Sequence, residues 1–382
     1  MSWENRNFKE LGFIGRGKSR HRPRNDESLY GGDYPMIQTG DVKAANFYLN
    51  SFSQTYNEKG LAQSKLWEPN TLCITIAANI AETAILGMKA CFPDSIIGFI
   101  ADEEKSDVRF IKYFFDIYKE RMQRVSQGTT QDNLSLEKLL TFEVPTPQLT
   151  TQKRIADILS AYDDLIENNL KRIKFLEEAA QNIYKEWFVH LRFPGHENTP
   201  INEETGLPEG WEEKPLGELT EIKKGKNITK STIIDGNVPV VAGGLKPACY
   251  HNSSNTINPV ITVSASGANA GYVNMYLENI WASDCSYIDS NLSDSVFFIH
   301  NLLLNQQELI FGMQRGAAQP HVYPKDLKRA EFIIPDKGLI QKFEEQVLPQ
   351  YNMKRVLLNQ IQKLKAARDI LLPRLMNRTI EV

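Results

Sequence analysis

The segment 155–187, IADILSAYDDLIENNLKRIKFLEEAAQNIYKEW, has an unusually regular apolar period. Apolar side chains recur in it at alternating steps of four and three residues, the heptad pattern of a helix that packs along a second helix. The seam residues are Ile155, Leu159, Tyr162, Ile166, Asn169, Ile173, Leu176, Ala180, Ile183 and Trp187. At about 1.5 Å per residue this helix is roughly 48 Å long. The segment therefore predicts one strand of a coiled coil.

A second helix of the same kind lies near the C-terminus, because the chain repeats itself once. Gly128-Thr-Thr-Gln131 returns 188 residues later as Gly316-Ala-Ala-Gln319. The repeated seam contains Leu357, Ile361, Leu364 and Leu371. Pro349 and Pro373 are expected to break or kink this copy, so that its most regular part lies between about 351 and 372. A duplicated globule and helix predicts two similar heads held by paired helices.

Asn169 is the single polar residue in the first seam. A buried polar side chain at such a position can fix the register of a coiled coil at some cost in stability. An asparagine at a frayed site explains the same residue equally well, and the sequence leaves the two interpretations open.

Both heads are expected to share one α+β fold. Apolar runs at 71–77 and 95–101 predict strands, and apolar residues at helical spacing predict a helix near 108–124. Thr75 aligns with Thr262 in the second copy, and Val108 aligns with Val296. The predicted division is head 1 at 1–147, a helical region at 148–192, a linker at 193–208, head 2 at 209–335 and a second helical region at 336–382.

The composition is that of an ordinary globular protein, with 41% hydrophobic and 24% charged residues. The N-terminus lacks the apolar stretch of a signal peptide, and no apolar run approaches the roughly 20 residues that span a bilayer. The four cysteines show no metal-site or disulfide spacing, which favours a reducing, cytoplasmic location.

Two stretches of the sequence match catalytic motifs, but the residues around them do not fit the structures that these motifs require. Gly12 to Ser19 fits the phosphate-binding loop G-x-x-x-x-G-K-S, but no apolar strand precedes it and no periodic helix follows it. Asp94 and Glu103 resemble a nuclease pair, yet a strand between them would separate them by about 30 Å. We therefore expect a non-catalytic chain without a metal site; an NTP-hydrolysing enzyme that uses Gly12–Ser19 is the alternative.

Each head carries a basic segment near its start and a Gly-x-x-Gln turn near its end. Although the net charge of −3 argues weakly against nucleic acid, local basic patches suit DNA phosphates, and glutamine can pair with an adenine edge. A turn-capping role for the two glutamines is an equal alternative. The predicted DNA-binding residues are Arg16, Lys18, Arg20, Arg22, Arg24, Gln131, Lys223, Lys224, Lys226, Lys230 and Gln319.

Several segments together resemble the specificity subunit of type I restriction–modification systems. They are GTTQDNLSLEKLLTFEVPTPQLTTQKRIADILSAYDDLIENN, QNIYKEWFVHLRFP, GLPEGWEEKPLGELTEIKKGK, ARDILLPRLMNRTIEV and IQTGDV at 37–42. The resemblance covers nearly the whole chain. It implies two target-recognition domains, each of which binds one half of a bipartite asymmetric DNA site, and an antiparallel coiled coil of two conserved helical regions. Pro349 departs from the regular helical pattern.

The resemblance also implies partners for the chain. These are double-stranded DNA, two methyltransferase (modification) subunits that bind the helical regions, and motor–nuclease (restriction) subunits. S-adenosylmethionine, ATP and magnesium would then belong to the partner subunits. A system that methylates without cleaving is a further possibility, which neighbouring genes or co-purified subunits would separate from restriction.

Overall fold

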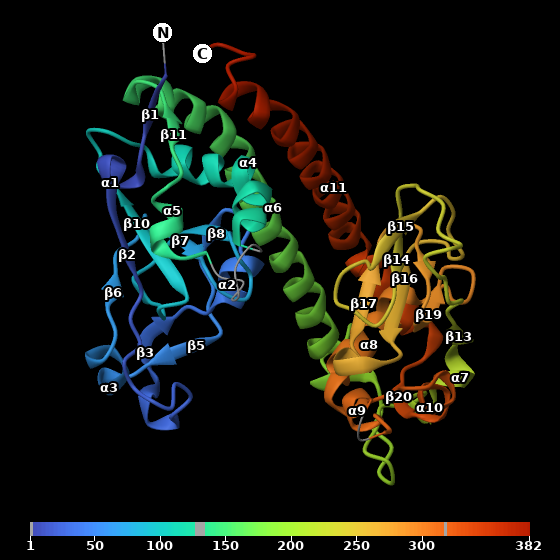
Figure 1. Cartoon of the computed structure of the whole chain (residues 1–382). Helices are drawn as coiled ribbons and strands as arrows, with labels where there is room; N and C mark the ends of the chain where they lie inside the picture. The colour runs from blue at the N-terminus through green and yellow to red at the C-terminus, as the bar shows by residue number, and fades with distance from the viewer. Residues whose placement is uncertain (1–2, 127–133, 317–318) are drawn as a thin grey trace. The chain divides into compact units, whose positions relative to one another are not determined.

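The computed structural model describes residues 3–126, 134–316 and 319–382. They form two compact units, Met1–Leu170 with Asn359–Val382 and Lys171–Leu358. Each unit contains one head and one half of each long helix, α6 (Leu149–Tyr184) and α11 (Lys337–Met376) (Figure 1). A wider helical turn, Lys185–Val189, follows α6. No helix among the described residues is long and apolar enough to cross a membrane.

Head 1 is built on three sheets, ordered β2-β10-β7-β8-β4, β5-β3-β9-β6 and β1-β11. The strands are β1 Glu4–Arg6, β2 Gly12–Arg16, β3 Tyr30–Met36, β4 Tyr48–Leu49, β5 Gln54–Tyr56, β6 Leu66–Trp67, β7 Leu72–Thr75, β8 Thr83–Leu86, β9 Ala90–Cys91, β10 Ile96–Ala101 and β11 Val144–Thr146. The helices are α1 Phe8–Leu11, α2 Thr39–Ala44, α3 Glu58–Ala62, α4 Val108–Ser126 and α5 Leu136–Leu139, with a 3₁₀ turn at Glu27–Leu29. The predicted strands and the helix near 108–124 are confirmed.

Head 2 repeats this arrangement with sheets β13-β19-β16-β17, β15-β14-β18 and β12-β20. The strands are β12 Glu212–Pro215, β13 Lys223–Lys224, β14 Val238–Val241, β15 Cys249–His251, β16 Val260–Ser264, β17 Val273–Tyr276, β18 Trp281–Ala282, β19 Cys285–Asp289 and β20 Glu331–Ile334. The helices are α7 Leu216–Leu219, α8 Val296–Asn305, α9 Gln307–Gly312 and α10 Pro324–Arg329, with 3₁₀ turns at His196–Asn198 and Gly267–Asn269. In both heads one strand pairs antiparallel with one neighbour and parallel with another, as β3 and β14 do.

The strand registers correct one alignment made from the sequence. Thr75 lies opposite Ile96, whose carbonyl accepts a hydrogen bond from Gly17. The corresponding carbonyl in head 2 belongs to Cys285, and Ser264 lies opposite it. Thr75 therefore corresponds to Ser264 and not to Thr262, because the strands of the two heads differ in length while the hydrogen-bond ladder keeps its order.

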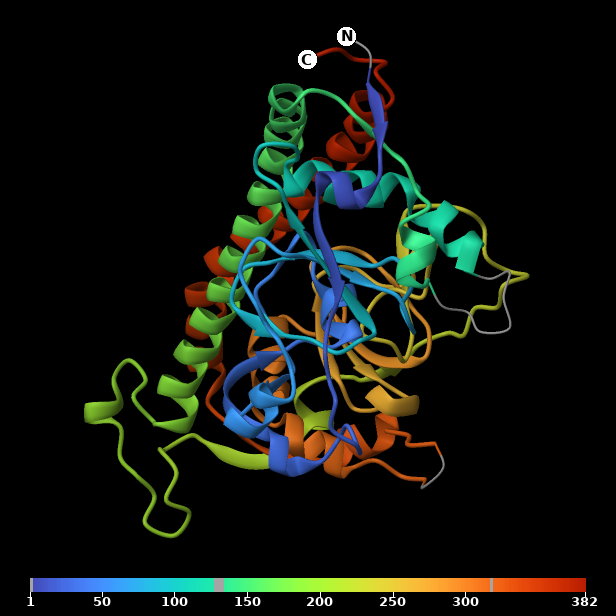
Figure 2. The same cartoon turned by 60° about the vertical axis from the view of Figure 1, so that its left-hand side comes forward.

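Each head shares a hydrophobic core with the long helices. In unit 1, Phe110 and Phe114 of α4 belong to one buried cluster with Ile155 of α6 and Leu375 of α11. The C-terminal end of α11 lies beside β1, where the Arg378 guanidinium is 4.9 Å from the Trp3 ring (Figure 2). In unit 2, Tyr184, Phe298 and Phe343 form the equivalent cluster. Burial of one such aromatic side chain contributes roughly 1.5–3 kcal/mol, so each head is anchored to its helices largely by apolar burial.

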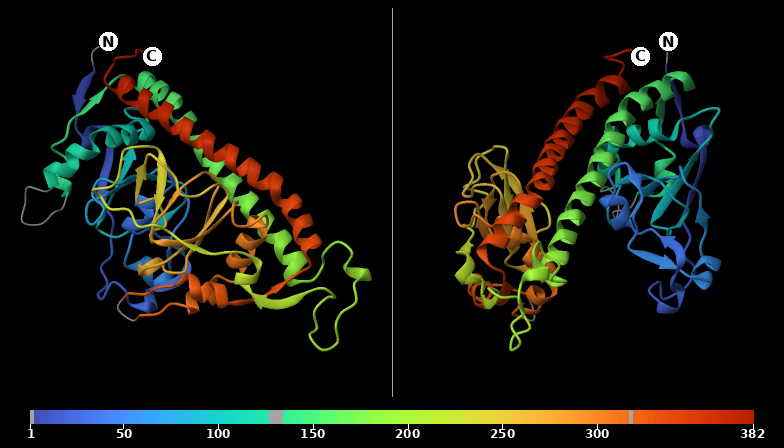
Figure 3. Two further views of the ribbon diagram at one scale, coloured as in Figure 1. Left: turned by 90° about the vertical axis from the view of Figure 1, so that its right-hand side faces the viewer. Right: turned by 180° about the vertical axis from the view of Figure 1, so that it is seen from behind.

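In each unit α6 and α11 pack side by side and run antiparallel (Figure 3). Asp163 pairs with Arg368 and Asn169 with Gln360 in unit 1, while Glu177 pairs with Lys354 in unit 2. As the residue number increases along α6, the number of its partner in α11 decreases, so the two helices run antiparallel. Of the predicted seam, Ile155, Leu159, Ile166, Asn169, Ile173, Ala180, Leu357 and Ile361 are buried, and Tyr162, Leu176, Ile183, Trp187, Leu364 and Leu371 are half-buried.

The expected break in the second helix is wrong. α11 continues through Pro349 and Pro373 from Lys337 to Met376. Both prolines are exposed, and so are Glu345 and Asp369, the residues four positions earlier whose carbonyls lose a helical partner. These carbonyls can bond to water, while the buried face of the helix stays packed on both sides of each proline.

Asn169 is 4% exposed, and its amide donates to Gln360 Oε1 on the facing helix at 3.3 Å. A frayed site would leave this side chain in water. The cross-helix bond favours the interpretation in which Asn169 fixes the register of the pair.

Glu344 of α11 provides a pH test of the packing in unit 2. It accepts a hydrogen bond from the Phe298 backbone N–H in the first turn of α8 at 2.6 Å, and burial raises its pKa from 4.5 to about 7. The folded state thus favours the protonated acid, and this contribution is complete below pH 4.5 and lost as the pH rises through 7.

A Glu344→Gln substitution keeps the acceptor oxygen and removes the ionisation. We expect little change at pH 4 and a gain of up to about 3 kcal/mol in unfolding free energy well above pH 7. Denaturant unfolding of both proteins at pH 4 and 8.5 checks this. An equal difference at the two pH values would contradict it.

Candidate nucleic-acid interface

The basic segment of head 1 is held against the sheet by backbone hydrogen bonds. The Gly17 N–H donates to the Ile96 carbonyl at 2.8 Å, and the Lys18 N–H donates to the Phe92 carbonyl at 2.9 Å. Gln63 Oε1 accepts from the Arg20 N–H at 2.6 Å. The backbone is therefore fixed while the arginine side chains remain exposed.

Head 2 holds its basic segment in the same way. The Gly225 N–H donates to the Cys285 carbonyl at 2.8 Å, and the Lys226 N–H donates to the Ala282 carbonyl at 2.9 Å. The Trp281 indole N–H also donates to the Lys226 carbonyl at 2.8 Å. Gly17 and Gly225 are equivalent positions, since each approaches the start of the strand that pairs with the basic segment.

Both glycines are required by this close approach. A Cβ atom at Gly17 would lie 2.3 Å from the Pro93 carbonyl oxygen, and one at Gly225 would lie 2.2 Å from the Ser283 carbonyl oxygen. Such distances are impossible without displacement of the backbone. The Gly-Lys pair is therefore the feature that lets the basic segment lie against the sheet.

In head 2 a short hairpin brings together the residues on either side of the second Gly-x-x-Gln sequence. Arg315 and His321 exchange backbone hydrogen bonds at 2.9 and 2.8 Å, and Gly316 takes φ +95°, which favours glycine. Gln319 is exposed in this turn. The hairpin is fastened to the end of β16, because the Val322 N–H donates to the Ala265 carbonyl at 3.0 Å.

Head 1 shows the same attachment. The Leu134 N–H donates to the Ile76 carbonyl at 3.1 Å, just beyond the end of β7. The Ile76 N–H in turn donates to the carbonyl of Ser95 at 3.0 Å, and Ser95 directly precedes Ile96, which accepts the hydrogen bond from Gly17. The predicted Gln131 lies outside the described residues, but the chain that follows it is anchored beside the basic segment.

The basic segment and the chain of the Gly-x-x-Gln turn thus meet at one end of the central sheet in each head. In head 2, Gly225 donates a hydrogen bond to Cys285, the first residue of β19. The Ala265 N–H donates to the carbonyl of the preceding residue, Asp284, at 3.1 Å. Ser266 also donates to the Asp284 carboxylate and forms a backbone bridge with His321. The sequence had paired these features across heads but did not indicate that they are neighbours in space.

The predicted basic residues differ in their availability. Arg16, Arg20, Arg22, Arg24, Lys223, Lys224, Lys226 and Lys230 are exposed, and Lys18 is half-buried. Arg24 forms a two-point ion pair with Asp94, at 2.7 and 2.9 Å. Arg22 donates to the Ser19 and His21 carbonyls, so its guanidinium stabilises the segment itself. Lys223 lies 3.8 Å from Glu221, a weak surface pair.

Two clusters of aromatic and basic residues were missed. In head 2 the His321 and Tyr323 rings stack at 5.8 Å, and Lys325 Nζ lies 5.5 Å from the Tyr323 ring. The alternation of these three residues along the chain was a usable signal. In head 1 Lys65 Nζ lies 3.6 Å from the buried Trp67 ring and 4.7 Å from exposed Phe13, a contact across 52 residues that no local pattern reveals.

The structure contradicts both catalytic alternatives. Gly12–Arg16 is strand β2, paired with β10, so this segment cannot curl around a phosphate. Asp94 and Glu103 stand at opposite ends of β10, and Asp94 is bound to Arg24. Across residues 3–126, 134–316 and 319–382 no group of histidine, cysteine, aspartate and glutamate side chains is arranged to hold a metal ion.

The fold defines a class: two α+β heads, alike in topology, joined by an antiparallel helix pair. The family model for the type I restriction modification DNA specificity domain matches residues 1–178 and 208–365. This chain belongs to that family and is a non-catalytic specificity subunit of the type I class.

Individual relatives agree with this assignment. The type I restriction enzyme MjaIX specificity subunit of Methanocaldococcus jannaschii is 26% identical over 98% of this chain and 92% of its own length. The MjaVIII specificity subunit of the same organism is 26% identical over 56% of this chain and 48% of its own length. The crystal structure of a type I restriction–modification S subunit from M. genitalium has a similar fold, with TM-score 0.58 and 17% identity over 98% of this chain and 96% of that one.

Proposed function

We propose that each head of this specificity subunit binds one half of a bipartite, asymmetric DNA sequence. The observation that carries the proposal is the meeting of a basic segment and the Gly-x-x-Gln chain at one end of the sheet in both heads. Lysine and arginine side chains there would contact phosphates, and Gln131 and Gln319 would contact base edges. The two heads present different side chains, so the two half-sites would differ.

The helix pair would set the distance between the half-sites. A helix of roughly 48 Å exceeds the 34 Å or so of one turn of DNA, so it is long enough to place two heads on successive turns of one face. The proposed division keeps head 1 at 1–147, the helical regions at 148–192 and 336–382, the linker at 193–208 and head 2 at 209–335.

The helical regions would also bind two methyltransferase subunits, to which motor–nuclease subunits are added if the system restricts DNA. S-adenosylmethionine, ATP and magnesium would act in those partners, in the cytoplasm. This chain would contribute the sequence choice, since the chemistry of methyl transfer and cleavage needs groups that belong to the partners.

Lysine substitutions test the DNA contacts. Removal of Lys18 or Lys226 is expected to weaken DNA binding for all sequences and to reduce the slope of log affinity against log salt by about one. Titration of the chain, bound to its methyltransferase subunits, with duplex DNA at several salt concentrations measures both effects.

Lys174→Ala is the matched control, because this exposed lysine lies on α6 outside both heads and its Nζ is 3.7 Å from Glu178 Oε1 of the same helix. Unchanged affinity and salt slope in both head variants would reject the proposed contacts.

A further inference from the structure

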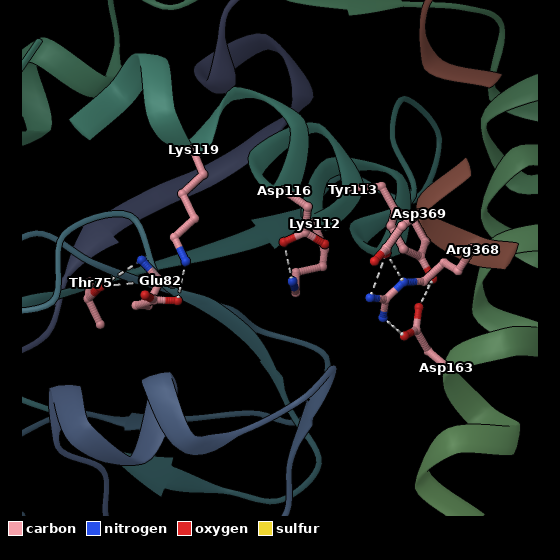
Figure 4. A network of polar contacts seen from close by, with 9 residues as sticks. All are labelled: Thr75, Glu82, Lys112, Tyr113, Asp116, Lys119, Asp163, Arg368 and Asp369. Atoms are coloured by element: carbon pink, nitrogen blue, oxygen red, sulfur yellow. Dashed lines mark hydrogen bonds and ion pairs between the residues drawn. The ribbon is translucent and has the colours of Figure 1, made fainter. Parts of the chain in front are cut away.

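A buried polar triad joins head 1 to both long helices. Tyr113 of α4 donates its hydroxyl hydrogen to Asp163 Oδ2 of α6 at 2.5 Å, and Arg368 of α11 donates to Asp163 Oδ1 (Figure 4). Asp163 is 1% exposed and Tyr113 is fully buried. Three helices thus meet at one buried carboxylate.

Unit 2 has a triad that also joins three helices. Gln181 of α6 donates to Asn301 Oδ1 of α8 at 2.7 Å, and Asn301 donates to the Tyr351 hydroxyl of α11 at 2.9 Å. His300 Nδ1 lies 3.0 Å from the same hydroxyl. Burial lowers the pKa of His300 to about 3, so this network is neutral.

Two members of each triad occupy repeated positions. Tyr113 and Asn301 are 188 residues apart, and so are Asp163 and Tyr351, which is the offset of the whole duplication. At one of these positions a carboxylate in unit 1 is replaced by a neutral hydroxyl in unit 2, yet both positions still bond across helices. A polar connection between head and helices is therefore common to both units, although its chemistry differs.

Apolar residues would fill these sites at less cost, since buried charges lose their hydration. Hydrogen bonds are directional, whereas apolar contacts are not. Buried polar groups therefore keep all their hydrogen bonds in only one arrangement of the helices. Burial raises the pKa of Asp163, whereas the bonds from Tyr113 and Arg368 lower it, so the ionised form depends on both partners. If α4 slid or rotated along α6, the carboxylate would lose the Tyr113 bond.

We propose that Tyr113, Asp163 and Arg368 in unit 1, and Gln181, Asn301 and Tyr351 in unit 2, are positioning residues that fix the orientation of each head on the helix pair. This inference rests on the proposed function. A head held in one orientation accepts one spacer length between the half-sites. A head released from its triad accepts neighbouring spacer lengths without any change in the bases it recognises.

Tyr113→Phe and Tyr351→Phe test the proposal with one hydroxyl removed from each triad. Each variant is produced in cells together with its methyltransferase subunits, and the modified bases are sequenced. The wild type should modify sites of one spacer length. Each variant should modify sites whose spacer is one base pair longer or shorter at least tenfold more often than the wild type does, with both half-sites unchanged.

Tyr118→Phe is the control, because Tyr118 lies on the same helix and its ring packs on Phe114 at 4.6 Å, outside the triad. A purely structural role would lower the melting temperature but leave a single spacer length, and that result would overturn the inference. Asp163→Asn, which keeps the shape and an acceptor oxygen, should give an intermediate loss of spacer selection. A wild type without any bipartite motif would instead reject the proposed function itself.

Discussion

Gly17→Ala and Gly225→Ala are each expected to destabilise one head by about 1–3 kcal/mol and to lower its DNA affinity about tenfold or more. The added methyl group would meet backbone carbonyl oxygens at 2.2–2.4 Å, and these oxygens belong to chain fixed at the start of a strand. The basic segment must then move away from the sheet. Because Lys18 and Lys226 follow directly, the proposed phosphate contacts move with it.

Two other glycines supply matched controls. A Cβ at Gly40 in head 1 meets nothing within 4 Å, and one at Gly244 in head 2 comes no closer than 3.5 Å to another atom. Gly40→Ala and Gly244→Ala should therefore preserve both properties. Thermal unfolding of the purified chain and the fraction of modified sites in cells measure the two effects. Normal modification by Gly17→Ala and Gly225→Ala would contradict the role given to these segments.

Insertion of heptads into both long helices is expected to lengthen the spacer and leave both half-sites unchanged. The insertions go between Leu170 and Lys171 in α6 and between Leu358 and Asn359 in α11, points that lie opposite each other, as the Asn169–Gln360 bond indicates. One heptad adds about 10.5 Å to a helix, or roughly three base pairs at 3.4 Å each.

Because the DNA duplex twists along its axis, one of the insertion variants is more informative than the others. Three heptads add about 31 Å, close to the 34–36 Å of one turn, so both heads would face the same side of the duplex again. We expect this variant to modify DNA better than the variant with one heptad. Insertion into α6 alone should abolish modification, because every seam contact beyond the insertion is shifted.

The helix pair could be predicted from the sequence because its signal is periodic and local. Between Ile155 and Ile173 the seam matches buried positions except at Tyr162, which is half-buried while its neighbour Asp163 is buried. The reason is that α4 packs against α6 from a second side and widens its buried face. A heptad pattern predicts the face that packs on one partner helix. It does not predict a second buried face that packs on another helix.

The site could be predicted only in part. The duplication linked Lys18 to Lys226 and the two Gly-x-x-Gln turns to each other, since repeated residues are visible along the chain. That these features meet at one end of the sheet depends on hydrogen bonds such as Gly225 to Cys285, which strand pairing creates over 60 residues. The triads were missed because single polar residues in long helices do not stand out, and only their contacts identify them.

The wild type and the three-heptad variant, each in cells that also carry the methyltransferase subunits, can be compared by sequencing of modified bases. We expect one bipartite asymmetric motif for the wild type. For the variant we expect the same two half-sites with a spacer longer by about nine base pairs. A contiguous motif, an unchanged spacer or altered half-sites would contradict the claim that two heads bind separate half-sites at a distance set by the helices.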